Sequence, residues 1–295
     1  MYKAFFGFRE NPFSLSPDPQ FLYRSAQHEE ALANLIYGVQ SRKGFIVLTG
    51  EVGTGKTTLL ECLREYLESQ YIEFGFLFNS RITSDQFFEM IAYDFNLPCR
   101  RQSKTEVLFA LNDMLIAQTN DGRTTVLIVD EAHNLEWDVL EEIRLLGNLE
   151  NRHGKLLQIV LAGQPEFDRK LDSPNLRQLK QRIVLRTTLQ PFGETDTADY
   201  IDYRLNRAGM EGQTIFSKHL ISEIHVRSQG IPRVINGICD NLLLTAFAME
   251  SKEATVEMLD EVSADMRLDW PSRRGRPLRS QAPFEPSAFG NRGTN

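Results

Sequence analysis

Cysteines are scarce in this 295-residue sequence, and long hydrophobic runs are missing altogether. Cys62, Cys99 and Cys239 are odd in number and lack the spacing of metal ligands, which argues against a disulfide scaffold and favours a reducing compartment. No segment reaches the ~18 to 20 uninterrupted apolar residues that a membrane-spanning helix needs, and the first ten residues do not resemble a signal peptide. We therefore expect a cytoplasmic protein that contacts a membrane only through a partner.

An excess of positive charge is also missing. The formal net charge is −7, which argues against a surface built throughout for nucleic acid and favours a protein partner. With 41% hydrophobic residues, the chain has enough apolar material for one large domain or two modest ones.

A phosphate-binding loop is the strongest motif in the sequence. The segment GEVGTGKTT fits the pattern G-x-x-x-x-G-K-[ST], between an apolar run predicted to be a strand and an amphipathic stretch predicted to be a helix. Glycines allow backbone N–H groups to turn inward around a phosphate, and the start of a helix favours negative charge. Lys56 is expected to reach the β- and γ-phosphates, and the Thr57 hydroxyl to ligate Mg²⁺. The predicted nucleotide-binding residues are Gly50, Glu51, Val52, Gly53, Thr54, Gly55, Lys56, Thr57 and Thr58.

A second motif is the apolar run TVLIV at residues 125–129, which leads into Asp130 and Glu131. We interpret it as a Walker B strand, with Asp130 in the Mg²⁺ shell and Glu131 orienting the attacking water. His133 completes the letters DEAH, which occur in helicases. Other helicase motifs are not evident, so we interpret His133 as a residue behind the site or on the surface.

Three further polar residues fall where a ring-forming ATPase needs them. Gln164 follows an apolar strand and can contact the γ-phosphate or the water, or simply open a turn before a proline. Arg182, with Arg177 in reserve, can reach a neighbouring subunit's site, or belong to a solvated helix face. Arg233 can reach back to the γ-phosphate from the start of a helix, or lie on the surface. The catalytic set is thus Glu131, Gln164, Arg182 and Arg233.

The order of the predicted elements indicates an α/β fold. Strand-like runs alternate with helical ones, which predicts a three-layer αβα P-loop NTPase with a parallel sheet, followed by a small all-helical lid. The nucleotide base is expected near residues 37–44, just before the first core strand. The predicted domains are an aromatic and proline-rich arm with a helix (1–43), the ATPase core (44–191), the lid (192–268) and a disordered basic tail (269–295). The predicted strands are 45–49, 74–78, 125–129, 156–162 and 183–185, and the predicted helices lie near 26–39, 84–96, 104–118, 138–149, 195–208, 217–228, 232–250 and 256–267.

Over about residues 1 to 267, the sequence resembles the AAA+ ATPases of the general secretion pathway protein A family (ExeA/GspA). Pilus-biogenesis and exosortase-associated ATPases are related to that family. The similarity begins with YKAFFGFRENPFSLSPDPQFLY and continues in order through GFIVLTGEVGTGKTTL, DEAHNL, LAGQPEF, LRQLKQRI and GIPRVIN. It implies ATP and Mg²⁺ as cofactors, a homo-oligomer, and work on an envelope machine at the inner membrane. By the same resemblance Gln164 is a sensor-1 residue, Arg182 an arginine finger and Arg233 a sensor-2 arginine.

Two features depart from the family. Its secretion members continue into a transmembrane helix and a peptidoglycan-binding domain, whereas this sequence ends in a short polar tail, so we expect no direct cell-wall binding. His133 stands where the family is expected to carry glutamine.

Three functions therefore compete. The first is an ATPase that assembles or remodels a secretion, pilus or polysaccharide-export apparatus. The second is a DNA-linked AAA+ regulator of the transposition target-selection type, which would show salt-dependent binding to duplex DNA. The third is a nucleotide-gated switch with negligible turnover, which the intact Glu131 disfavours.

Overall fold

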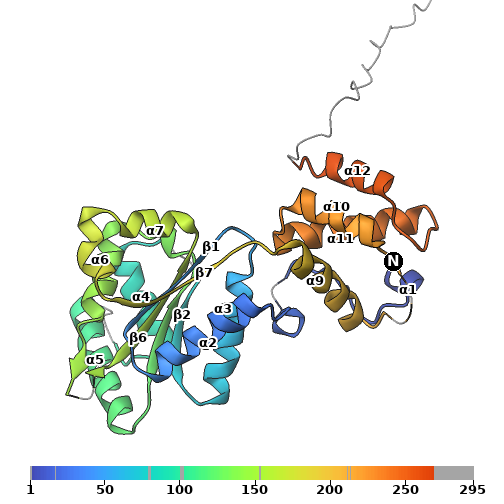
Figure 1. Cartoon of the computed structure of the whole chain (residues 1–295). Coiled ribbons are helices and arrows are strands. Elements are labelled where there is room, and N and C mark those ends of the chain that lie inside the picture. The colour runs from blue at the N-terminus through green and yellow to red at the C-terminus, as the bar shows by residue number, and fades with distance from the viewer. Residues whose placement is uncertain are drawn as a thin grey trace, which may run out of the picture.

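The computed structural model consists of a sheet-centred core and a helical bundle joined by extended connections (Figure 1). It describes residues 2–16, 18–78, 81–99, 103–152, 154–210, 212 and 214–268. The predicted disordered tail, residues 269–295, lies outside the described residues.

A five-stranded parallel sheet forms the centre of the core, in the strand order β2-β3-β6-β1-β7. The strands are β1 (Phe45–Gly50), β2 (Glu73–Leu77), β3 (Thr125–Val129), β6 (Leu157–Gly163) and β7 (Ile183–Leu189). Because all five are parallel, the loops that leave β1, β3 and β6 emerge at the same edge.

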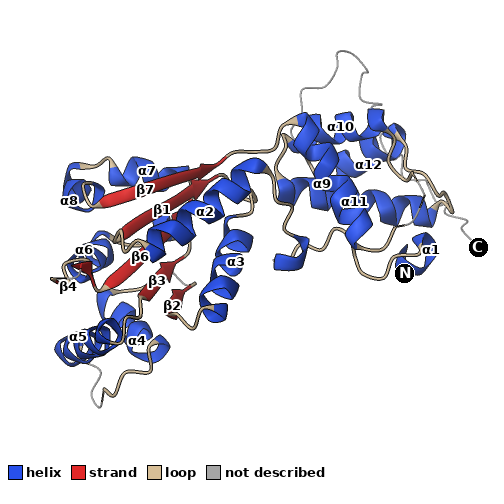
Figure 2. Ribbon diagram, turned by 60° about the horizontal axis from the view of Figure 1, so that its bottom comes forward, coloured by secondary structure: helices blue, strands red, loops and turns tan. Residues whose placement is uncertain are grey.

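Helices cover both faces of this sheet (Figure 2). Successive strand residues point to opposite faces, so Ile46 packs toward one side and Val47 toward the other. One face carries α2 (Ala26–Gln40) and α3 (Lys56–Ser69). The other face carries α4 (Ser84–Asp94), α5 (Lys104–Asn120), α6 (Trp137–Leu146), α7 (Pro165–Leu171) and α8 (Arg177–Lys180). The predicted three-layer α/β P-loop fold is confirmed.

Short elements complete the core. The two-residue strands β4 (Glu150–Asn151) and β5 (Gly154–Lys155) pair as an antiparallel hairpin. Short 3-10 helices span Pro19–Phe21, Ala132–Asn134 and Pro174–Leu176. The hairpin and α7 were not among the predicted elements.

The second body is all-helical in the described residues. It contains α9 (Glu194–Arg207), α10 (Lys218–Ser228), α11 (Pro232–Ala248) and α12 (Val256–Asp265), and its own hydrophobic core is separate from those of the sheet. None of the helices in the described part of the chain combines the length and apolar character required to cross a bilayer.

The N-terminal arm packs against this helical body. Its first residues form a helix, α1 (Tyr2–Phe6), which was not among the predicted helices. Phe6, Phe8 and Phe13 are buried in the lid core, and Tyr2 hydrogen-bonds to Asp240 on α11. The chain thus begins in the lid, passes along it, and only then enters the core at α2.

Candidate functional site

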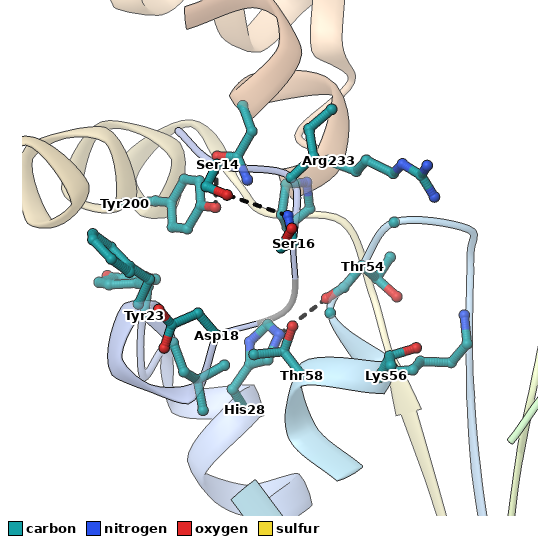
Figure 3. Close-up of a pocket in the computed structure, with 18 of the residues that line it drawn as sticks. Ser14, Ser16, Asp18, Tyr23, His28, Thr54, Lys56, Thr58, Tyr200 and Arg233 are labelled. Carbon is teal, nitrogen blue, oxygen red and sulfur yellow. Dashed lines mark hydrogen bonds between the residues drawn. The ribbon is translucent and has the colours of Figure 1, made fainter. Parts of the chain in front are cut away.

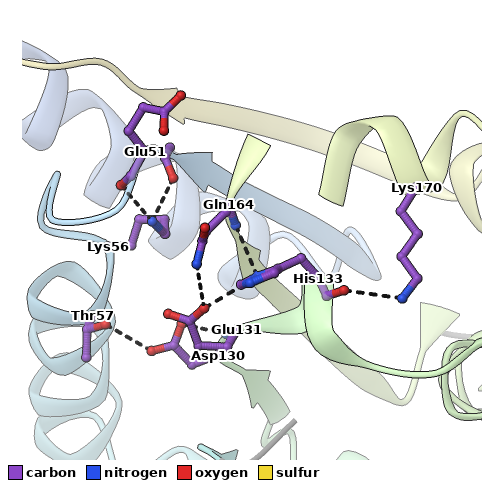
Figure 4. Close-up of polar contacts among 9 residues, drawn as sticks. Glu51, Lys56, Thr57, Asp130, Glu131, His133, Gln164 and Lys170 are labelled. Atoms are coloured by element: carbon purple, nitrogen blue, oxygen red, sulfur yellow. Dashed lines mark hydrogen bonds and ion pairs between the residues drawn. The ribbon is translucent and has the colours of Figure 1, made fainter. Parts of the chain in front are cut away.

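The phosphate loop lies between the end of β1 and the start of α3. Lys56 is 5% exposed, and its Nζ donates to the carbonyl oxygens of Gly50 at 2.7 Å and Glu51 at 2.9 Å (Figure 4). Gly53 and Gly55 have φ values of +83° and +101°, a region that side-chain-bearing residues avoid. The loop therefore depends on glycine at these two places.

Burial sets the electrostatics of this loop. It lowers the pKa of Lys56, and the carboxylates of Glu131 and Asp130 oppose that shift. Burial also raises the pKa of Asp130, against the hydrogen bonds that its carboxylate accepts. The cation and the acidic pair thus share one poorly solvated space, where charges interact strongly.

Asp130 connects the two predicted motifs. The Thr57 hydroxyl donates to Asp130 Oδ2 at 3.0 Å, and the backbone N–H of Glu131 donates to Oδ1 at 2.8 Å. This pairing arises because β3 carries Asp130 to the same sheet edge at which α3 begins. A hydroxyl oxygen and a carboxylate oxygen therefore lie side by side. Oxygen atoms of these kinds are the ligands that Mg²⁺ prefers.

Glu131 lies in the left-handed region, with φ +53° and ψ +35°. Its Oε2 accepts from Gln164 Nε2 at 3.3 Å and lies 3.4 Å from His133 Nδ1 (Figure 4). Gln164 follows β6, the neighbour of β3, so sheet topology explains why these side chains meet. The carboxylate is accessible and has polar neighbours on one side.

His133 belongs to this cluster. Its side chain is 13% exposed, and Nδ1 also lies 3.4 Å from the backbone N–H of Gln164. Lys170 on α7 donates to the backbone carbonyls of His133, at 3.2 Å, and Leu135. Of the two interpretations of His133, the structure thus favours the residue behind the site over the surface residue.

Arg233 approaches the loop through its backbone. Its N–H donates to the carbonyl of Gly53 at 3.1 Å, while its exposed side chain extends over the loop that carries Thr54 (Figure 3). A Cβ added to Gly53 would lie 2.6 Å from the Cβ of Arg233. The helical body therefore contacts the phosphate loop directly, at the start of α11.

Arg182 lies elsewhere. It precedes β7, whose first residue pairs with Phe45 at the start of β1, and six residues of strand separate it by roughly 20 Å from the phosphate loop. Its Nη1 donates to the carbonyl of Arg144 at 3.0 Å and contacts Asn148 Oδ1. Arg177, on α8, is exposed. Neither arginine joins the site of its own chain.

A pocket of about 330 Å³ adjoins the phosphate loop (Figure 3). Its lining comes mainly from the arm and the start of α2 (within residues 14–16 and 18–28), the loop and the helical body, and Glu131 also contributes. The stretch 37–44, where we expected the nucleotide base, contributes none of the residues that line this pocket. Residues of the arm line this space instead, among them Ser14, Phe21 and Tyr23.

His28 was missed by the motif analysis. It is 2% exposed, and its Nε2 lies 3.1 Å from the carbonyl of Thr54, which can only accept. Nε2 therefore carries the proton, and Nδ1 accepts from the Ser25 hydroxyl at 2.8 Å. Burial lowers the pKa of His28. A neutral histidine thus supports the phosphate loop from behind, and only its place on the helix after Ser25 could have suggested it.

The chain matches a known domain family and is similar to a known protein. Residues 39–171 match the AAA domain. The chain is 46% identical over 252 residues to general secretion pathway protein A of Aeromonas hydrophila, a match that covers 85% of this chain and 46% of the relative. The chain thus spans about half the length of the curated relative that it matches.

Solved structures share the fold. Cdc6p from Pyrobaculum aerophilum superposes with a TM-score of 0.68 at 20% identity, over 88% of this chain and 71% of that one. The ORC2 protein of Aeropyrum pernix gives 0.66 at 16% identity, over 88% and 72%. The RuvB branch migration motor of Thermotoga maritima gives 0.56 at 14%, over 83% and 70%. At these identities the likeness concerns the fold alone.

Proposed function

Because the chain belongs to the AAA ATPases and is a relative of general secretion pathway protein A, we propose that its ATP hydrolysis depends on Mg²⁺ and drives the assembly or remodelling of a secretion, pilus or exopolysaccharide-export apparatus.

One observation supports the chemistry above the others, namely the convergence of two motifs at one sheet edge. Thr57 and Asp130 are joined by a 3.0 Å hydrogen bond, and the Glu131 carboxylate follows directly, with Gln164 beside it. Phosphoryl transfer needs charge neutralisation and an oriented water more than covalent chemistry. Lys56 would neutralise the phosphates, and Glu131 would orient the water.

The donor set fits Mg²⁺. Within the described residues, no group of three or more His, Cys, Asp or Glu side chains forms a metal cage. Mg²⁺ is typically held by one or two protein groups, with waters and substrate phosphates completing its shell. Thr57 and Asp130 would hold the ion, which would neutralise charge on the phosphates when bound.

Steady-state hydrolysis tests this chemistry. ATP turnover should require Mg²⁺ and stop when EDTA removes the metal. Lys56→Ala should reduce turnover by at least about a hundredfold, because the point charge on the phosphates is lost. Arg169→Ala is the matched control, since Arg169 is an exposed cation on α7. Full hydrolysis in EDTA, or by Lys56→Ala, would refute the assignment.

The work proposed rests on the relative, of which this chain matches less than half. We propose that the chain forms a homo-oligomer, acts in the cytoplasm, and reaches the inner membrane through an envelope-assembly or export protein. Motion of the helical body is its output, since Arg233 and Gly53 connect that body to the loop.

Partner capture tests this role. The variant Glu131→Gln should hold ATP, so its complexes can be isolated from native cells with and without nuclease. Envelope-assembly or export proteins that survive nuclease and require ATP would support the proposal. DNA or a recombinase that is lost on nuclease treatment would instead support the DNA-linked alternative.

A further inference from the structure

Arg204 is a buried cation on α9 that the motifs do not explain. Arg204 is only 6% exposed. Its Nε donates to the carbonyl oxygen of Pro12 at 2.5 Å, and its Nη2 donates to that of Ser14 at 3.0 Å. Both acceptors are backbone groups of the N-terminal arm. The helical body thus holds the arm through one side chain.

Two aromatic rings complete the surroundings of this guanidinium. Its central carbon lies 4.6 Å from the ring centre of Phe21 and 5.7 Å from that of Tyr200. Cations are attracted to ring faces, most strongly where water is excluded. Phe21 comes from the arm and Tyr200 from α9, so Arg204 also joins the rings from the two segments.

These groups line the pocket beside the phosphate loop. Arg204, Ser14, Phe21 and Tyr200 all contribute to its wall, on the arm and lid side, while Lys56 and Thr57 contribute on the loop side. Figure 3 shows the same division, with Tyr200 and Tyr23 across the pocket from Lys56. A nucleotide whose phosphates lie on the loop would place its base and ribose on the side of these rings.

The wall is also connected to the loop. The Tyr200 hydroxyl donates to Asn236 Oδ1 at 2.8 Å, and Asn236 lies on α11, one turn after Arg233. The backbone of Arg233 donates to Gly53. Hydrogen bonds therefore connect the ring wall to the start of α11, next to the phosphate loop.

We propose that Arg204 is a positioning residue for the nucleoside half of the nucleotide, which holds Pro12, Ser14 and Phe21 in place as the wall against which a purine base packs. The inference rests on the proposed nucleotide function. It predicts that Arg204 affects the binding of nucleotides and has no effect on that of phosphates alone.

Calorimetry of the full chain with Mg²⁺ and either ATP or inorganic triphosphate tests the proposal. Comparing the two ligands separates the contribution of the nucleoside from that of the phosphates. Arg204→Ala should weaken ATP binding by at least about tenfold, because the wall loses its anchor. Triphosphate contacts only the loop, so its affinity should change by less than about twofold. Lys218→Ala, which removes an exposed cation from the same helical body, should change neither affinity.

Other outcomes are equally informative. Equal weakening of ATP and triphosphate, or no weakening of either, would overturn the role of Arg204. If Arg204→Ala does not fold, Arg204→Lys decides in the same assay, since a lysine ammonium lacks the planar fork whose Nε and Nη2 reach the two carbonyls. A wild-type chain that binds neither ligand would instead refute the proposed nucleotide function.

Discussion

At the scale of single residues, the conformation of Glu131 is the most informative feature of the site. A left-handed backbone costs a residue with a side chain about 1 kcal/mol or more, and such residues often occur at functional sites. Here the turn directs the backbone N–H of Glu131 to Asp130 while its carboxylate reaches Gln164. The strained turn thus lets two adjacent acids take different roles.

Glu131→Gln tests these roles. The substitution preserves size and keeps an oxygen that can accept from Gln164, but it removes the negative charge that would polarise a water. We expect ATP affinity to stay within about threefold of wild type, and turnover to fall by about a hundredfold or more. Equilibrium binding and single-turnover hydrolysis measure the two quantities. Near-normal turnover would remove Glu131 from the reaction.

How far the site could be predicted depends on how local its chemistry is. The loop residues Gly50–Thr58 and the pair Asp130 and Glu131 were recognisable because their spacing follows from phosphate and metal geometry. Gln164 could be proposed because it follows a strand. His28 could not, because its role depends on how α2 meets the loop.

At the scale of elements, α2 does more than cover the sheet. Ser25 caps its start by accepting from the backbone N–H of His28, as expected from its residue type. The same hydroxyl binds the His28 ring, which in turn supports Thr54 and packs against Phe192. The first turn of α2 therefore contacts both the phosphate loop, at Thr54, and the segment that leads from β7 into the helical body, at Phe192.

Replacing His28 should therefore destabilise the fold. His28→Ala leaves the Thr54 carbonyl unpaired and opens a cavity, and we expect a loss of about 2 kcal/mol in the free energy of unfolding at pH 7.5. His28→Gln should lose less, since its amide can donate to that carbonyl. Urea denaturation measures both. Equal stability of His28→Ala and wild type would contradict the supporting role.

The same histidine predicts a pH dependence. Burial lowers its pKa in the folded state below the ordinary value of 6.5, against smaller opposing effects of the hydrogen bond to the Thr54 carbonyl and of the charge on Asp196. The unfolded chain then binds the proton more readily, so the contribution of His28 is complete above pH 6.5 and is lost as pH falls below it. The stability of wild type relative to His28→Gln should decrease between pH 7.5 and 5.5. A difference that is constant with pH would contradict this.

Long, regular elements could be predicted, and short ones could not. The five strands were recognisable from apolar runs bounded by polar residues, and the four lid helices from their periodicity. The α7 helix has seven residues and α1 has five, too few for periodicity to identify. Tyr2–Phe6 becomes helical because Tyr2 and Phe6 fall on one side and pack into the lid core.

At the scale of the whole molecule, the arm and Arg182 show what a linear sequence conceals. The arm comes first in the sequence, yet Phe6 and Phe13 lie in the core of the helical body, whose own helices come last in the sequence. Arg182 lies at the amino end of β7, whereas the phosphate loop leaves the opposite end of β1. An arginine there can serve phosphate chemistry only in another subunit.

A mixing experiment tests that conclusion. Arg182→Ala and Glu131→Gln should each be nearly inactive alone, the first because a neighbour's site lacks its cation and the second because its own site cannot orient water. In a ring of head-to-tail contacts, a randomly mixed 1:1 assembly pairs an intact site with an intact arginine at roughly a quarter of its interfaces. Turnover should therefore recover toward that fraction of wild type, and Arg177→Ala in place of Arg182→Ala should be active alone. Absence of recovery at every mixing ratio, with co-assembly shown by light scattering, would mean that Arg182 has only the structural contacts to Arg144 and Asn148.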